Sequence, residues 1–125
     1  MAEEITVNLS LSVYRPASML AAVGRSVEDL LFDMAATDWI HTAVAVGTSV
    51  AGIPLGAVSL PHWAFFMNHH ATTWIKVSAD SSVATNIIKL LAGEVAFVPL
   101  VTTITSLYAI AGSSNAYLEY MIFGL

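Results

Sequence analysis

The sequence contains no cysteine and only four basic residues among its 125. Without cysteine, neither disulfide bonds nor thiolate metal ligands are available, so burial and hydrogen bonding have to hold the fold together. Nine acidic residues bring the formal net charge to −5 at pH 7. This balance argues against contact with the phosphate backbone of nucleic acids, and we expect no nucleic-acid partner.

Charge of either sign is scarce. Only 10% of the residues are charged and 57% are hydrophobic, against roughly 25% and 45–50% in ordinary soluble domains. A monomer with so little charge cannot easily cover its surface with polar groups, which predicts that part of the apolar excess meets a partner. The alternative is a membrane protein. The uncharged stretches at 39–75 and 95–118 are long enough to span a bilayer, but glycine, proline, serine and threonine interrupt both.

Two further signals of membrane insertion or export are absent from the sequence. The flanking basic residues that normally set membrane topology are nearly missing. The opening Met-Ala-Glu-Glu lacks the basic and apolar regions of a secretory signal. We therefore expect no membrane partner.

Short alternating or apolar runs, separated by glycine, asparagine, aspartate and serine, recur along the chain. From Ile5 to Val13 apolar and polar residues alternate strictly, which is typical of a strand with one buried face. Eight or nine such strands up to Phe123 predict one all-β domain over 1–125, an antiparallel β-sandwich of Ig-like or jelly-roll-like type. Within it we expect a long loop at 47–61, carrying a short strand near 53–55.

Residues 14–26 are open to two interpretations. Ser18 is placed to cap a short helix that Gly24 would end, but the segment equally fits an extended arm or loop. Tight turns are predicted at 92–94 and at 112–115, and we expect the strands at 63–68 and 72–78 to form a hairpin across His69-His70.

Residues able to do chemistry do not converge in the sequence. His69 and His70 are adjacent, so in a strand they point to opposite faces and cannot share a metal. A zinc site or an enzyme would need His41 and His62 to join one of them. Polar turn residues are the favoured interpretation, with pH sensing at an interface as an alternative. Asp29 and Asp33 fit a solvated acidic face.

Sequence motifs for catalysis are absent as well. The string at 47–52 lacks the setting of a nucleophile elbow, and no Gly-Lys-Ser/Thr phosphate loop follows it. We predict no catalytic residues, no cofactor and no metal, hence no enzyme.

Aromatic residues suggest a surface function instead. Phe66 and Trp74 are predicted to point outward, and with Tyr14 and Trp39 they form our candidate interface, because outward aromatics are enriched where proteins meet. An alternative stays open, in which these residues only cover the edges of the core.

Several short motifs occur in a distinctive order. They are the opening strand at 4–9, W-A-F-F-M-N at 63–68, A-T-T-W-I-K-V at 71–77, K-L-L-A-G-E at 89–94, L-Y-A-I-A at 107–111 and L-E-Y-M-I-F at 118–123. In this order the chain resembles a group of small virion structural proteins of tailed bacteriophages. The resemblance covers the first strand and the second half, leaving out 14–60. Ala92 departs from the pattern, since a proline often precedes Gly-Glu there.

This resemblance implies a non-enzymatic virion component, assembled in the host cytoplasm. We expect a capsid cement or decoration protein that stabilises the shell as a homo-oligomer such as a trimer, and that contacts itself and the major capsid protein or other virion proteins. A tail or head–tail connector component is the alternative within this class. In another class, a small carbohydrate-binding or ligand-binding sandwich would use outward tryptophans as a sugar platform.

Overall fold

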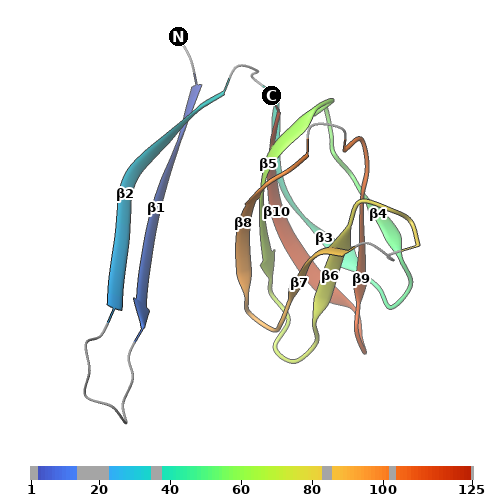
Figure 1. Cartoon of the computed structure of the whole chain (residues 1–125). Helices are drawn as coiled ribbons and strands as arrows, with labels where there is room; N and C mark the ends of the chain where they lie inside the picture. Colours follow the sequence, from blue (N-terminus) through green and yellow to red (C-terminus); the bar gives the residue numbers. More distant parts are fainter. Residues whose placement is uncertain (1–2, 14–22, 35–37, 83–85, 102–103, 125) are drawn as a thin grey trace. The chain divides into compact units, whose positions relative to one another are not determined.

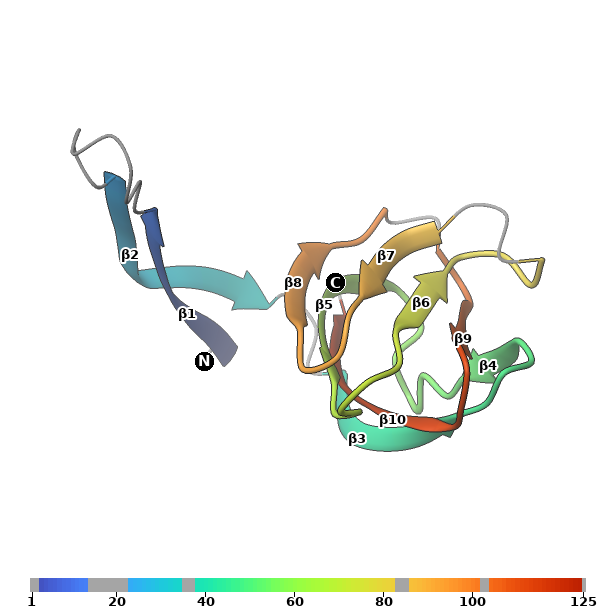
Figure 2. The same ribbon diagram turned by 90° about the horizontal axis from the view of Figure 1, so that it is seen from below.

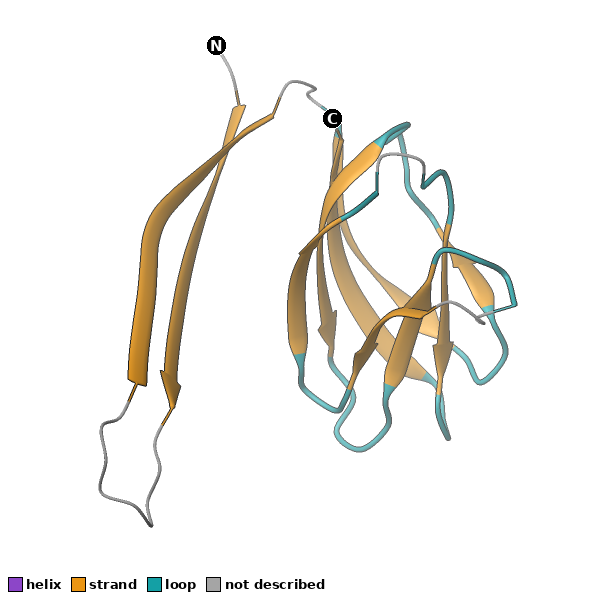
Figure 3. Ribbon diagram, in the orientation of Figure 1, coloured by secondary structure: helices purple, strands orange, loops and turns teal. Residues whose placement is uncertain are grey.

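The computed structural model describes residues 3–13, 23–34, 38–82, 86–101 and 104–124. The chain divides into two compact units, Met1–Ala35 and Ala36–Leu125. Every regular element in the described residues is a strand (Figure 3). Within that part of the chain, no helix is long and apolar enough to cross a membrane.

The first unit is a two-stranded antiparallel hairpin of β1 (Glu3–Val13) and β2 (Val23–Met34). Its register places apolar positions opposite each other, with Ile5 opposite Phe32, Val7 opposite Leu30 and Leu9 opposite Val27. Positions 23–26 of the predicted arm belong to β2, while 14–22, including Tyr14, lie outside the described residues. The two predicted N-terminal strands therefore pair with each other in a sheet of their own.

The second unit is a β-sandwich of eight strands in two four-stranded antiparallel sheets (Figure 1). The strands are β3 (Trp39–Val46), β4 (Ala51–Ile53), β5 (Pro61–Asn68), β6 (Ile75–Ser78), β7 (Asn86–Leu90), β8 (Val95–Pro99), β9 (Leu107–Ala111) and β10 (Ala116–Gly124). One sheet has the order β3-β10-β5-β8 and the other β4-β9-β6-β7. Figure 2 shows the sheets end-on, on either side of the core.

The strand pairs are nested: β3 with β10, β4 with β9, β5 with β8 and β6 with β7. This is the pairing of one long hairpin, β3 to β6 against β7 to β10, rolled up into two sheets. Such an eight-stranded arrangement is a jelly roll. The predicted all-β sandwich is therefore confirmed, and its jelly-roll form is the one observed.

The predicted hairpin across His69-His70 is wrong, because the two strands that it joins do not pair with each other. The turn at His69-His70 joins β5 to β6, the turn at 92–94 joins β7 to β8, and the turn at 112–115 joins β9 to β10, and each leads from one sheet to the other. Turn residues show where the chain reverses, but strand partners are decided by which faces are buried. The predicted loop at 47–61 contains β4, two residues before the predicted short strand.

Alternating residues of the facing sheets fill the core. Phe66 of β5, Ile75 of β6 and Leu118, Tyr120 and Ile122 of β10 are fully buried. Each apolar side chain of this size contributes about 1.5–3 kcal/mol on burial. The Tyr120 hydroxyl donates to a backbone carbonyl 2.6 Å away, so its polar atom is satisfied inside the core, and burial raises the pKa of this phenol.

One buried amide ties together the turns at one end of the sandwich. The Asn68 Nδ2 lies 2.8 Å from the carbonyl oxygen of Thr73, 3.2 Å from that of Leu90 and 3.0 Å from that of Leu91. The Gly93 N–H donates to the Asn68 carbonyl at 3.0 Å, and Gly93 has a φ of 77°, which glycine adopts without strain. The two turns are thereby held against each other.

Candidate protein–protein interface

The outer side of the β3-β10-β5-β8 sheet is apolar, and we call it the aromatic face. Cross-strand partners line up in rows whose members lie on this side of the sheet, in the order β3, β10, β5, β8. The rows are Trp39–Phe123–Trp63–Pro99, His41–Met121–Phe65–Phe97 and Ala43–Glu119–Met67–Val95. Alternate residues of β5 and β10 that point the other way are buried. An antiparallel sheet normally presents polar residues on its solvated face, so these rows are unusual.

Aromatic rings on this face stack across strands. The Trp39 and Phe123 ring centroids are 6.4 Å apart, and those of Trp63 and Phe97 are 5.1 Å apart, each pair nearly parallel. Trp39 remains 53% exposed and Val95 57% exposed. Contiguous exposed apolar surface of this kind marks sites of protein–protein contact, and rings held by their neighbours lose little side-chain freedom on binding.

Three ionisable side chains interrupt the aromatic face, and one of them, Glu119, is hydrogen-bonded to the other two. Glu119, near the middle of β10, lies with Oε1 3.5 Å from the His41 Nε2 and with Oε2 3.1 Å from the His69 Nε2. Both hydrogen bonds lower the pKa of the Glu119 carboxyl, and the bond with His69 has the larger effect. His41 comes from β3, Glu119 from β10 and His69 from the position after β5. Their hydrogen bonds therefore link these three parts of the sheet on its outer side.

The four predicted interface residues have different positions. Trp39 lies on the aromatic face, whereas Trp74 precedes β6 in the opposite sheet, and Tyr14 lies outside the described residues. Phe66 is completely buried, so its assignment to an interface is wrong. Its neighbours Phe65 and Met67 face outward instead, because W-A-F-F-M is apolar at both parities and the pattern alone does not tell which face is buried.

Several residues of the aromatic face were not predicted, namely Trp63, Phe65, Phe97, Met121 and Tyr117. A signal for all of them except Phe97 exists in the sequence, since the strands at 63–67 and 117–123 are apolar on both faces apart from Glu119. A strand of this composition is covered on both sides. One side is the sandwich core, and the other is therefore a candidate contact surface.

The histidines do not converge on one centre. His41 and His69 share Glu119, whereas His70 belongs to its turn, where its Nδ1 accepts from the backbone N–H groups of Thr72 at 3.0 Å and Thr73 at 2.9 Å. The His62 Nδ1 is buried and has no hydrogen-bond partner in the described structure. Across the residues that the structure describes, no group of histidine, cysteine, aspartate or glutamate is placed to hold a metal.

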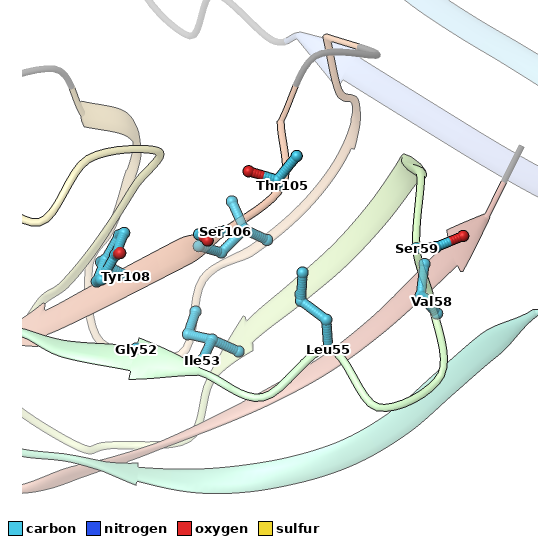
Figure 4. Close-up of a pocket in the computed structure, with 9 residues that line it drawn as sticks. Gly52, Ile53, Leu55, Val58, Ser59, Thr105, Ser106 and Tyr108 are labelled. Atoms are coloured by element: carbon cyan, nitrogen blue, oxygen red, sulfur yellow. The ribbon is translucent and has the colours of Figure 1, made fainter.

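An open hollow of about 370 Å³ lies beside β4 and the start of β9 (Figure 4). Its lining residues are Gly52, Ile53, Leu55, Val58, Ser59, Thr105, Ser106, Leu107 and Tyr108. This lining includes hydroxyl groups but no carboxylate, imidazole or amine. A serine or threonine hydroxyl needs an adjacent base to become a nucleophile, so these lining residues do not form a catalytic group.

Comparison of the chain with protein-family models, with curated proteins and with solved structures finds no match.

Proposed function

We propose that this protein is a non-enzymatic structural component of a tailed-phage virion, specifically a capsid cement or decoration protein that acts as a homo-oligomer. The aromatic face is the observation that carries an assembly function. The resemblance to small virion proteins supplies the kind of particle.

Burial of the apolar surface of the aromatic face would favour association. A standard interface covers about 800 Å² on each partner, and at about 25 cal/mol per Å² this corresponds to roughly 20 kcal/mol gross per partner. Association costs on the order of 4–15 kcal/mol have to be subtracted. Ordering of side chains and desolvation of polar groups reduce the gain further, and repetition over a shell would strengthen a modest affinity through avidity.

The ionisable groups of the aromatic face support its burial. A carboxylate that loses water without a partner is strongly destabilising. Here both oxygens of Glu119 already have imidazole partners within the same subunit, at 3.1 and 3.5 Å. A second subunit that covers this carboxylate would therefore leave neither of its oxygens without a hydrogen bond.

The N-terminal hairpin supports assembly independently of the aromatic face. A two-stranded hairpin is marginally stable in water and needs a third strand or another packed element. The β1–β2 unit has only two strands in its sheet, and its apolar positions coincide in the register. A surface that covers it, on a neighbouring virion protein, would meet this requirement.

Light scattering behind size exclusion tests the assembly function. We expect a discrete oligomer for the unmodified chain, and a shift to monomer when Trp39→Ser and Val95→Glu are combined on the aromatic face. Val101→Glu is the matched control, because Val101 is 66% exposed and follows β8. A monomeric parent chain, or a double variant that assembles like the parent, would contradict the proposal.

Co-sedimentation with purified capsid shells tests the position in the particle. A cement protein should pellet with the shells, and the double variant should remain in the supernatant while Val101→Glu still pellets. Binding to tail tubes and not to shells would instead assign the protein to the tail or connector.

A further inference from the structure

The sheet that carries the aromatic face has one open edge without the usual protection. The edge strands are β3 and β8 in this sheet, and β4 and β7 in the other. Strand edges present unpaired N–H and C=O groups, and proteins commonly protect them by short length, lysine or proline. β4 has only three residues, β7 carries Lys89, and Pro99, which has no N–H, ends β8. β3 has eight residues and contains no lysine, no proline and no acidic residue.

β3 is also regular and accessible along its length. Its ladder with β10 has no register shift, so no bulge turns the edge away. Among the described strands, none pairs with β3 on the side away from β10 (Figure 2). Its exposed residues are Trp39, His41, Thr42, Ala43 and Ala45. A long, regular and largely apolar edge of this kind is a template for pairing with a further strand.

The backbone groups at this edge are those of the odd-numbered residues of β3. The Gly124 N–H donates to the Asp38 carbonyl at 2.8 Å, and these two residues continue the register of β3 with β10. Backbone groups of successive residues in a strand point to opposite sides, so the even-numbered residues of β3 bond to β10. Four residues therefore present their N–H and C=O groups to the outside, namely Trp39, His41, Ala43 and Ala45. Within the described residues, no backbone hydrogen bond outside the ladders involves any of the four.

One antiparallel register with a second copy of β3 uses the outward groups of all four residues. It is centred on Thr42, which lies opposite Thr42 of the second copy. Trp39 then lies opposite Ala45, and His41 lies opposite Ala43, so that each large side chain faces a small one. Cross-strand threonine pairs stabilise antiparallel strands. β3 is therefore complementary to itself along the whole edge.

We propose that β3 pairs in this register with β3 of a second copy, so that two four-stranded sheets join into one sheet of eight strands. The proposal rests on the self-association in the proposed function, but it uses the sheet edge and not the aromatic face. Opposite residues of an antiparallel pair lie on the same side of the sheet. Because Trp39 and His41 lie on the aromatic face, the aromatic faces of the two copies become continuous. The dimer thereby presents a larger apolar surface to a capsid than one copy does.

A single cysteine at position 42 tests the register, because the chain has no cysteine of its own. The Cα atoms of a non-hydrogen-bonded antiparallel pair are about 4.5 Å apart, within the range of roughly 4.4–6.8 Å that a disulfide spans. Thr42→Cys should therefore give a covalent dimer on a non-reducing gel after oxidation with diamide. Ala45→Cys is the matched control, since it is exposed on the same strand. In this register the two copies of position 45 are about six residues, or roughly 20 Å, apart, and they should not crosslink.

Hydrogen exchange of backbone amides, followed by nuclear magnetic resonance, tests the pairing without a crosslink. Ala43→Lys adds to β3 the kind of residue that protects other strand edges, and it should prevent the pairing. The outward amides of β3 should then exchange about tenfold or more faster than in the parent. The amides of Ile40 and Val44, which bond to β10, should stay protected in both proteins. Thermal melting establishes that the variant is folded.

The outcomes separate this proposal from the assembly function. If light scattering shows an oligomer but Thr42→Cys does not crosslink, the edge pairing is wrong and the assembly function stands. A monomeric parent contradicts both. Protected outward amides without a crosslink at position 42 would mean that another strand, such as one of a neighbour's N-terminal hairpin, occupies the edge, and the proposal would be wrong. Equal crosslinking of Ala45→Cys, or equal exchange in the parent and Ala43→Lys, would also overturn it.

Discussion

At the scale of single residues, Asn68 shows how much one buried polar side chain organises. Its amide nitrogen is within hydrogen-bond distance of three carbonyl oxygens, and its side-chain oxygen accepts from the His70 N–H at 2.9 Å. The residue is fully buried. Since β5 and β7 lie in different sheets, no backbone ladder joins them. The Asn68 amide links the ends of these two strands by hydrogen bonds.

Replacing Asn68 with aspartate should destabilise the fold by roughly 3 kcal/mol or more at neutral pH, because a carboxylate would face three carbonyl oxygens without a donor. The free energy of unfolding from urea denaturation measures this. Asn115→Asp is the control, as Asn115 is exposed and should change stability little. Similar losses for both substitutions would mean that the turns do not depend on the Asn68 amide.

At the scale of elements, β10 connects most of one sheet. It pairs with β3 on one side and β5 on the other, and its inward residues Leu118, Tyr120 and Ile122 are fully buried. Its outward Glu119 holds His41 and His69. The same strand thus contributes to the core, to the aromatic face and to the polar bridge across that face.

The pH dependence of stability should reveal the Glu119 bridge. Its pKa in the folded protein is lowered from 4.5, so its contribution to stability is fully present above about pH 4.5 and is lost as the pH falls through the lowered pKa. Urea denaturation between pH 7 and 3 should show that the parent loses this advantage over Glu119→Gln in the acid range.

A second measurement tests whether the hydrogen bond with His69 lowers the pKa of Glu119. The Glu119 side-chain carbon, titrated by nuclear magnetic resonance, should show a higher pKa in His69→Gln than in the parent, because the first of its two imidazole partners is gone. An unchanged pKa in that variant, or identical pH profiles for parent and Glu119→Gln, would contradict the bridge.

Strands were easier to predict than their partners. Alternation marked 5–13 correctly as a strand, and apolar runs bounded by turn residues gave β5, β8, β9 and β10 within a few positions. Pairing escaped prediction because β3 and β10 are separated by most of the sandwich in sequence. Phe66 was placed on the wrong side for a related reason. In a strand that is apolar throughout, either the odd or the even positions can face the core. Which of them does so depends on the other sheet, whose strands are distant in sequence.

At the scale of the whole molecule, the two units should separate in folding. The chain divides into two compact units, Met1–Ala35 and Ala36–Leu125, and the second unit has a buried core of its own between Val46 and Ile122. We expect a fragment of residues 36–125 to unfold cooperatively with a clear thermal midpoint, and a peptide of residues 1–35 to lack stable strand structure in water. Circular dichroism measures both.

An unfolded 36–125 fragment would show that the hairpin completes the sandwich core. A folded 1–35 peptide would show that the hairpin needs no covering surface, and would remove one of the two arguments for assembly.

The sequence predicted that an aromatic surface is available for contact, but not most of the residues that form it. Scarce charge and abundant aromatics indicated a covered surface, and Trp39 was identified within it. The rows that unite Trp39, Phe123 and Trp63 require the jelly-roll register, which brings together strands that no local pattern connects.

The central position of β10 also constrains how the protein is made. Because β10 lies between β3 and β5, this sheet cannot close until residues 116–124 have left the ribosome. During synthesis β3 and β5 are present before β10, the strand that pairs with both of them. Their apolar faces are exposed in that interval and can aggregate. Closure of this sheet is therefore a late step in the folding of the sandwich, because it comes after β3 and β5 have been made.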